Sequence, residues 1–247
     1  MSSSYYIGGI HAVLSVLQGE RSVSKIFISS EVHKGRIKEI ATLAKSQKIP
    51  LQEARPQKLD EMLPDVRHQG VIALLAPIRY RDIQEMVDLA ASRNEDPFLV
   101  IVDGVEDPRN LGAIIRSAEA FGVHGVIIPK RGASPITSVT EKTAAGALER
   151  VFVAQVGNIS QEVERMKKMG IWIGGLALDN ATEMSAQRLD GPIALVLGNE
   201  EKGISRLVKE KCDFLVYIPM NGLVGSLNVS VAAGIGFYEV QRQRKMS

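Results

Sequence analysis

The sequence predicts an α/β protein in two parts, with a small N-terminal α/β unit followed by a parallel sheet that has helices on both faces. The 247 residues suit one large domain or two small ones. A composition of 45% hydrophobic and 23% charged residues is typical of a folded chain. Beyond residue 97, apolar runs of strand length alternate with helical patterns, which indicates a parallel sheet.

Residues 1–77 are predicted to form the first unit. Ile10, Val13, Leu14 and Leu17 recur at helical spacing. The next patterns are those of a strand, a mostly polar helix and a buried closing strand, at residues 25–29, 32–48 and 70–76. This segment carries 10 lysines and arginines against 7 acidic residues, a mild bias that is more typical of an ordinary solvated surface than of an RNA-facing one.

Residues 78–96 are interpreted as a linker that contains one helix. Ile83, Met86, Val87 and Ala90 share one face of that predicted helix.

Residues 97–247 are predicted to form the second, larger domain. Its expected strands are residues 98–103, 125–129, 171–178, 193–198 and 214–219. The chain then ends in a predicted helix over residues 228–244, where Arg242 and Arg244 complement the helix dipole.

Several classes of protein are disfavoured. No apolar run reaches the roughly 18 residues that span a bilayer, and no secretory signal is visible, so we expect a cytoplasmic protein. The one cysteine, Cys212, has no internal disulfide partner, and the four histidines lack ligand spacing, so no metal is expected. A Gly-x-Gly-x-x-Gly fingerprint is absent, and Ile204 stands where a P-loop requires lysine.

Three polar segments follow predicted strands, where open α/β sheets place their ligands. The first contains Asn110 and Arg116. Helical side chains lean toward the N-terminus, so Arg116 is expected to pass over the small Gly112 and Ala113 toward Asn110. The alternative is that Asn110 is a helix N-cap and Arg116 a surface cation.

The second segment places Glu200 in a loop bounded by Gly198 and Gly203, although an exposed loop glutamate is commonplace. In the third, Ser226 and Asn228 precede the last helix, where N-capping is their alternative role. Small residues in that helix permit close approach by another helix or by backbone, as in a tightly packed substructure or a dimer contact.

Together these segments resemble the three ordered motifs of the SpoU, or TrmH, family of RNA ribose 2′-O-methyltransferases. The likeness is carried by Asn110 with Arg116, by Glu200 with Gly203, and by Ser226 with Asn228 and the small residues after it, and it spans residues 97–247. Residues 6–13 and 68–71 resemble the ribosomal-protein-like substrate-binding domain of the RlmB-type branch, which methylates a guanosine of large-subunit ribosomal RNA.

The resemblance implies a deep trefoil knot, S-adenosylmethionine (AdoMet) as cofactor, RNA as substrate and a homodimer whose active site is completed across the dimer. It implies cofactor contacts at Leu176, Gly198, Ile218, Met220 and Leu227. It implies a catalytic centre of Asn110, Arg116, Glu200, Ser226 and Asn228.

Arg116 is expected to clamp an RNA phosphate rather than to accept a proton, because a guanidinium stays protonated in proteins. Glu200 and Asn110 would orient Arg116 and the ribose. The motifs leave a transfer-RNA methyltransferase open as an alternative. A non-catalytic RNA-binding or ribosome-assembly protein is less favoured, because the implied catalytic residues are intact.

Overall fold

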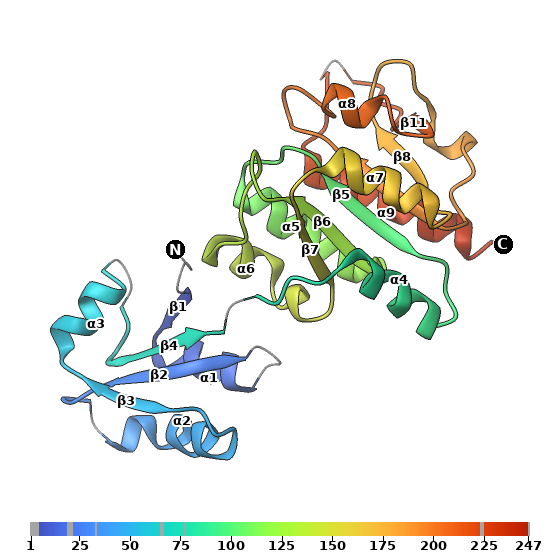
Figure 1. Ribbon diagram of the computed structural model, residues 1–247. Coiled ribbons are helices and arrows are strands. Elements are labelled where there is room, and N and C mark those ends of the chain that lie inside the picture. The colour runs from blue at the N-terminus through green and yellow to red at the C-terminus, as the bar shows by residue number, and fades with distance from the viewer. Residues whose placement is uncertain are drawn as a thin grey trace. The chain divides into compact units, whose positions relative to one another are not determined.

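The computed structural model describes residues 5–18, 22–32, 34–64, 67–76, 78–222 and 225–246. The chain divides into two compact units, Met1–Ile78 and Arg79–Ser247, which are coloured blue to cyan and green to red in Figure 1. Each unit is described by itself.

The first unit is a mixed sheet with helices. Its elements are β1 (Tyr5–Gly8), α1 (Ile10–Gln18), β2 (Val23–Ser29), α2 (Lys34–Ser46), β3 (Leu51–Ala54), α3 (Pro56–Met62) and β4 (Val71–Leu75). The strand order is β1-β4-β2-β3, in which β4 runs antiparallel to both of its neighbours and β2 pairs parallel with β3. The core joins α1 and α2 to the sheet through Val13, Leu17, Ile26, Ile40, Ala44, Val71 and Ala73.

The second unit contains a parallel sheet, of which the described residues form seven strands in the order β7-β6-β5-β10-β8-β11-β9. Its elements are α4 (Ile83–Ser92), β5 (Phe98–Val102), α5 (Pro108–Ala120), β6 (Gly125–Pro129), α6 (Ser138–Ala144), η1 (Ala147–Glu149), β7 (Phe152–Val156), α7 (Ile159–Lys168), β8 (Trp172–Leu176), β9 (Thr182–Glu183), η2 (Met184–Ala186), β10 (Ile193–Leu197), α8 (Arg206–Lys209), β11 (Phe214–Tyr217) and α9 (Val229–Arg244).

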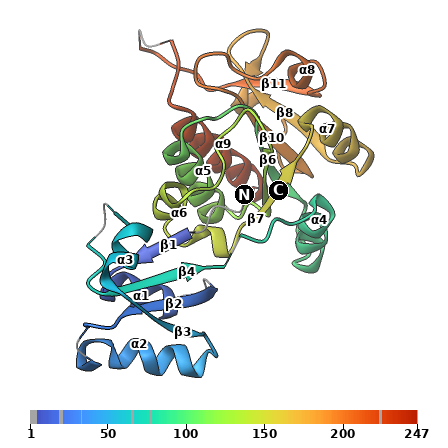
Figure 2. The ribbon, with the colours of Figure 1, turned by 60° about the vertical axis from the view of Figure 1, so that its left-hand side comes forward.

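Helices cover both faces of this sheet, with α4 and α7 on one side and α5 and α9 on the other (Figures 1 and 2). Every residue of β5 and β10 is buried, as expected for central strands that are covered on both faces. On β5, Leu99 and Ile101 join the core beneath α4 and α7. Phe98 points the other way and meets Phe237 of α9 edge to face, with ring centroids 5.8 Å apart.

The segment interpreted as a linker belongs almost entirely to the second unit. Its predicted helix forms as α4, and its apolar face is buried in the core through Ile83 and Met86. Met86 fills the space above Gly125 of β6, where a Cβ would collide with the methionine sulfur. The boundary between the units therefore lies near residue 78, and residues 79–96 are part of the larger fold.

Four strands that the sequence patterns did not indicate are β1, β3, β7 and β9. The helix α3 was also not predicted. The trefoil knot implied by the resemblance stays a prediction. Within the described residues no helix has the length and apolar character needed to cross a membrane, and a cytoplasmic location likewise stays a prediction.

Candidate active site

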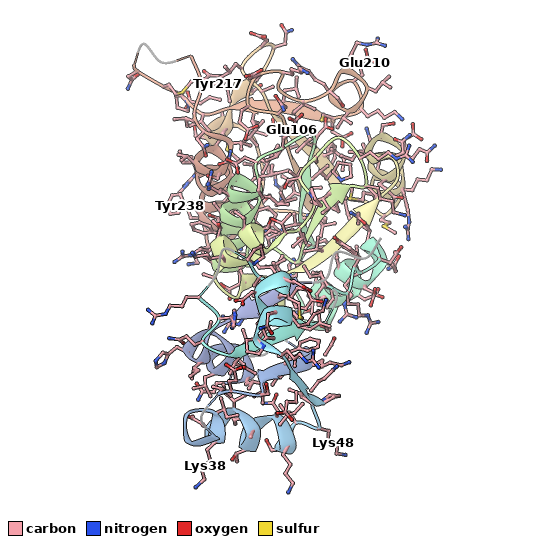
Figure 3. All side chains as sticks on the ribbon, turned by 90° about the vertical axis from the view of Figure 1, so that its left-hand side faces the viewer. Lys38, Lys48, Glu106, Glu210, Tyr217 and Tyr238 are labelled. Carbon is pink, nitrogen blue, oxygen red and sulfur yellow. The ribbon has the colours of Figure 1, made fainter. Side chains whose placement is uncertain are left out.

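A pocket of about 450 Å³ lies at the carboxyl ends of β8, β10 and β11. Glu106, which follows β5, and Tyr217, which ends β11, lie at this same end of the unit (Figure 3). The apolar lining of the pocket consists mainly of Leu176, Leu178, Val216, Ile218, Met220, Leu227 and Val229. This volume falls in the range of about 300–1,000 Å³ that is usual for small-molecule sites.

The residues that the resemblance assigned to the cofactor come together here. Leu176 ends β8, Gly198 follows β10, and Ile218 and Met220 follow β11, while Leu227 precedes α9; all five line the pocket. Asp179, Glu200, Glu201, Lys202 and Lys209 add charged groups to the lining.

Position 198 requires glycine because another segment of the backbone crosses directly over it. A Cβ at this position would collide with the backbone of Gly203 and Ile204, which passes directly over it. The turn between these residues is closed by a bridge in which Asn199 and Gly203 exchange backbone hydrogen bonds of 3.0 and 2.9 Å. The tight turn lifts Glu200 onto the rim of the pocket, where its side chain is exposed.

Three of the residues assigned to the catalytic centre form one hydrogen-bonded chain. Asn110 Nδ2 donates to Glu200 Oε1 at 2.6 Å. Asn110 Oδ1 accepts from Asn228 Nδ2 at 3.1 Å. The contacts join residues that are 90 and 118 positions apart in the sequence, and Glu200 connects the chain to the pocket.

The direction of this chain is set by the start of α9. Asn228 is the N-cap of that helix, and its Oδ1 accepts from the backbone N–H of Ser230 at 3.0 Å. Its Nδ2 therefore points away from the helix and can only donate, so Asn110 must present its oxygen to Asn228 and its Nδ2 to Glu200. The capping role expected as the alternative for Asn228 thus orients the whole chain.

Asn110 itself is not an N-cap. Asp107 caps α5 by accepting from the backbone N–H of Arg109, and Asn110 lies within the first turn. Ser226 is exposed on the pocket lining, beside Leu227.

Arg116 is exposed on α5, and among the described residues it makes no hydrogen bond or ion pair with any other side chain. Its expected path over Gly112 is wrong. Gly112 is buried against α6, where a Cβ would lie 2.6 Å from the carbonyl oxygen of Thr140 and 2.7 Å from Cβ of Thr143. The small residue admits a neighbouring helix, and Arg116 is exposed on the surface of this unit.

The sequence did not indicate two hydrogen bonds that join the loop after β5 to the loop that carries Glu200. Asn199 Nδ2 donates to the carbonyl oxygen of Gly104 at 2.8 Å. Asp103 Oδ2 accepts from the backbone N–H of Ser205 at 2.8 Å. The only signal for Asn199 in the sequence is its place between a glycine and the conspicuous Glu200.

The thiol of Cys212 packs behind the pocket wall, and a Cβ on Gly175 of β8 would lie 3.1 Å from its Sγ. Burial raises the pKa of this thiol to about 11, so it is protonated near neutral pH and is a poor nucleophile. Among the residues the structure describes, no group of three His, Cys, Asp or Glu side chains is arranged to hold a metal ion.

Comparisons with known proteins cover both units. Residues 97–238 match the SpoU rRNA methylase family, and residues 6–81 match the family described as RNA 2′-O ribose methyltransferase substrate binding. The chain is 44% identical over 241 residues to a Bacillus subtilis (strain 168) protein that bears the name TrmH family tRNA/rRNA methyltransferase YacO, and the match covers 97% of this chain and 96% of that protein.

Solved structures share the fold. The SpoU methyltransferase AviRb from Streptomyces viridochromogenes superposes with a TM-score of 0.76 at 26% identity, covering 98% of this chain and 90% of AviRb; a second AviRb structure contains the cofactor AdoMet. A TrmH/SpoU tRNA modifying enzyme from A. aeolicus is 32% identical with a TM-score of 0.57, covering 62% of this chain and 77% of that enzyme. With one family matched over most of the larger unit and a relative aligned along nearly its full length, this chain belongs to the SpoU rRNA methylase family.

Proposed function

We propose that this protein transfers a methyl group from AdoMet to a ribose 2′-hydroxyl of RNA, and that its substrate is a guanosine of large-subunit ribosomal RNA. One observation carries the proposal. Asn110, Glu200 and Asn228 form a single hydrogen-bonded chain at the rim of a pocket that is lined by all five residues assigned to the cofactor.

The pocket fits an adenosyl group that carries a sulfonium. Leu176, Ile218 and Leu227 offer apolar surface to an adenine ring. The carboxylates of Asp179 and Glu200 lie on the same lining, where they favour a positive charge. Bound AdoMet would supply a methyl group on a positively charged sulfur. The ribose oxygen would bond to the methyl carbon as the carbon–sulfur bond breaks, and the sulfur would leave as a neutral thioether.

The residues of this chain then have to place the ribose oxygen in line with the methyl group at about 3–3.5 Å. Asn110 engages one oxygen of Glu200, which leaves the other oxygen to accept a hydrogen bond from the ribose. Ser226 and Asn228 shape the loop that leads into α9. Arg116 is exposed and unpaired within the described residues, so its guanidinium is available to bind an RNA phosphate.

Ribosomal RNA is favoured over transfer RNA by the extent of the matches. The segment 6–81 matches a substrate-binding family of RNA 2′-O ribose methyltransferases, whereas the tRNA modifying enzyme from A. aeolicus covers only part of the chain. We infer that residues 1–78 supply much of the RNA affinity. A chain shortened to begin at Arg79 should bind AdoMet normally and lose most of its affinity for ribosomal RNA at fixed salt; unchanged RNA affinity would contradict this division of labour.

The decisive test is methyl incorporation from labelled AdoMet into deproteinised ribosomal RNA and into transfer RNA, with the product mapped by its resistance to alkaline cleavage at a 2′-O-methyl. We expect ribosomal RNA to be labelled at one ribose. Labelling of transfer RNA alone would establish the alternative substrate. Absence of transfer to either RNA, with AdoMet bound, would favour a non-catalytic RNA-binding protein.

Binding of AdoMet should not need a metal ion. Calorimetric titration in the presence and absence of a chelator is expected to give the same affinity. Loss of the binding signal with the chelator would refute this part of the proposal.

We also infer a homodimer that forms through α9. Val231, Ile235 and Tyr238 follow one another at helical spacing and are 50%, 40% and 56% exposed, and Tyr238 points outward from the unit (Figure 3). Such an apolar stripe on a surface helix is typical of an interface. Light scattering should give twice the 26.9 kDa chain mass, and Ile235→Asp should shift the protein to monomer; a fully active monomeric wild type would contradict the inference.

A further inference from the structure

The turn that carries Glu200 is held together by its first residue, Asn199. The side-chain oxygen of Asn199 accepts from the backbone N–H groups of Glu201 and Lys202 at 2.9 and 3.1 Å. These N–H groups have no strand partner, so the carboxamide oxygen satisfies donors that the turn would otherwise leave unpaired. One end of the carboxamide thus fixes the shape of the turn.

The other end of the same carboxamide fixes where the turn lies. Asn199 Nδ2 donates to the carbonyl oxygen of Gly104 at 2.8 Å. Gly104 lies in the loop between β5 and α5 and has a φ of +85°, a conformation that favours glycine. Because α5 begins at Pro108 and carries Asn110, this bond ties the Glu200 turn to the loop that leads to Asn110.

This hydrogen bond between the two loops is needed because the pairing of β5 with β10 ends before Asn110 and Glu200 are reached. The last paired residues of β5 and β10 are Val102 and Leu197. Beyond them each strand enters its own loop, yet Asn110 Nδ2 and Glu200 Oε1 must meet at 2.6 Å. Asn199 continues the connection between the two loops over this gap.

We propose that Asn199 is a positioning residue, whose carboxamide holds the Glu200 carboxylate against Asn110 by bonding the Glu200 turn with its oxygen and the Gly104 carbonyl with its nitrogen. The proposal rests on the proposed function only in so far as Glu200 takes part in methyl transfer. A neutral amide is required, since only a group that accepts at one end and donates at the other satisfies both partners.

Two substitutions separate the two ends of the carboxamide. Asn199→Asp keeps an acceptor for the Glu201 and Lys202 N–H groups but turns an oxygen toward the Gly104 carbonyl. Asn199→Ala removes both ends. Asn221→Asp is the matched control. Asn221 is exposed, adjoins the pocket residue Met220 and makes no side-chain hydrogen bond with any described residue. The substitution therefore adds the same charge without changing a contact of the loops that carry Gly104 and Glu200.

The first measurement is the single-turnover methylation rate of the full-length protein against pH. At neutral pH both Asn199 variants should lose about 10- to 100-fold in rate, the effect of a displacement near 1 Å, while the AdoMet dissociation constant of Asn199→Asp changes by less than about 3-fold. As the pH falls from neutral toward the ordinary aspartate pKa of about 3.9, the rate of Asn199→Asp relative to wild type should recover, because the protonated acid donates to the Gly104 carbonyl. The ratio for Asn199→Ala should stay flat.

The second measurement does not depend on activity. In protein labelled with ¹⁵N-asparagine, the Asn110 side-chain amide resonance reports its bond to Glu200, and Glu200→Ala defines the unbonded position. Asn199→Asp should move the resonance toward that position at neutral pH and back at low pH, and Asn221→Asp should leave it in place.

An Asn199→Asp protein with the wild-type rate at neutral pH overturns the proposal. A loss of rate in which the Asn110 resonance does not move also overturns it, and so does a loss of rate that is matched by an equal loss of AdoMet affinity. If the wild type itself methylates no RNA, the proposed function fails, and the resonance still decides whether Asn199 positions Glu200.

Discussion

Gly198→Ala tests whether the tight backbone crossing above β10 builds the pocket. The residue has no positive φ, so alanine is excluded only by space. A Cβ would lie 2.6 Å from the carbonyl oxygen of Gly203 and collide with the neighbouring backbone of Ile204. To reach ordinary contact, residues 203 and 204 must move by about 1 Å, which breaks the bridge between Asn199 and Gly203.

The cost follows from these changes. Overpacking costs about 1–3 kcal/mol, and the two lost backbone hydrogen bonds add about 0.5–1.5 kcal/mol each. A loss of about 2–6 kcal/mol lowers the melting temperature of a unit of this size by roughly 4–24 °C. Gly203 and Ile204 line the pocket and are the residues displaced by this substitution, whereas a side-chain change at Asn199 leaves the backbone bridge to Gly203 in place. The AdoMet affinity of Gly198→Ala should therefore fall at least about 10-fold.

Two glycines of the same pocket are matched controls. Gly203 has open space for a Cβ but a φ of +68°, so Gly203→Ala should cost only about 1–2 kcal/mol of backbone strain. Gly225 has open space and no positive φ, so Gly225→Ala should be neutral. Fluorescence of Trp172, the only tryptophan, reports unfolding of this unit, and calorimetry reports AdoMet binding. A Gly198→Ala protein that melts and binds like Gly225→Ala would refute the reasoning.

Three further substitutions probe charged and polar groups. Arg116→Lys keeps a charge but loses the bidentate fork, so methylation should fall substantially at constant AdoMet affinity; near wild-type rate with a pH profile moved to lower values would instead indicate a proton acceptor. Burial lowers the pKa of His124, whose Nδ1 accepts from the N–H of Phe98 at 3.0 Å. Its contribution to stability is therefore complete above the unfolded pKa of about 6.5 and is lost as pH falls below it, a dependence that denaturation of His124→Asn should lack. Arg244 donates to three backbone carbonyl oxygens at 2.9–3.1 Å, so Arg244→Lys should cost about 2–4 kcal/mol in the same assay, against less than about 1 kcal/mol for Arg242→Lys; equal effects would contradict this.

The strands absent from the sequence-based prediction share one property. In the orders β1-β4-β2-β3 and β7-β6-β5-β10-β8-β11-β9, they are the two edges of each sheet. Central strands such as β5 and β10 are buried on both faces and give continuous apolar runs. An edge strand pairs on one side only; β3 is largely exposed and β9 is two residues long. The hydrophobic pattern alone therefore predicts the central strands of each sheet and misses the edge strands.

The site likewise combines residues that local sequence motifs identify with residues whose partners are brought together only by folding. Motif resemblance located the residues of the pocket and of the hydrogen-bonded chain. The roles of Asn199 and Gly112 depend on partners distant in sequence or on another helix, Gly104 and Thr140, which no local pattern identifies. Gly112 was expected to make room for a side chain, and it makes room for α6.

The placement of α4 shortens the segment that joins the two compact units. Arg81 is already bound to the second unit, because its backbone N–H donates to the carbonyl oxygen of Val153 at 2.8 Å. Only residues 76–80 lie between it and the end of β4, whereas the linker expected from the sequence extended to residue 96. A chain that began after α4 would therefore expose the core to which Ile83 and Met86 contribute.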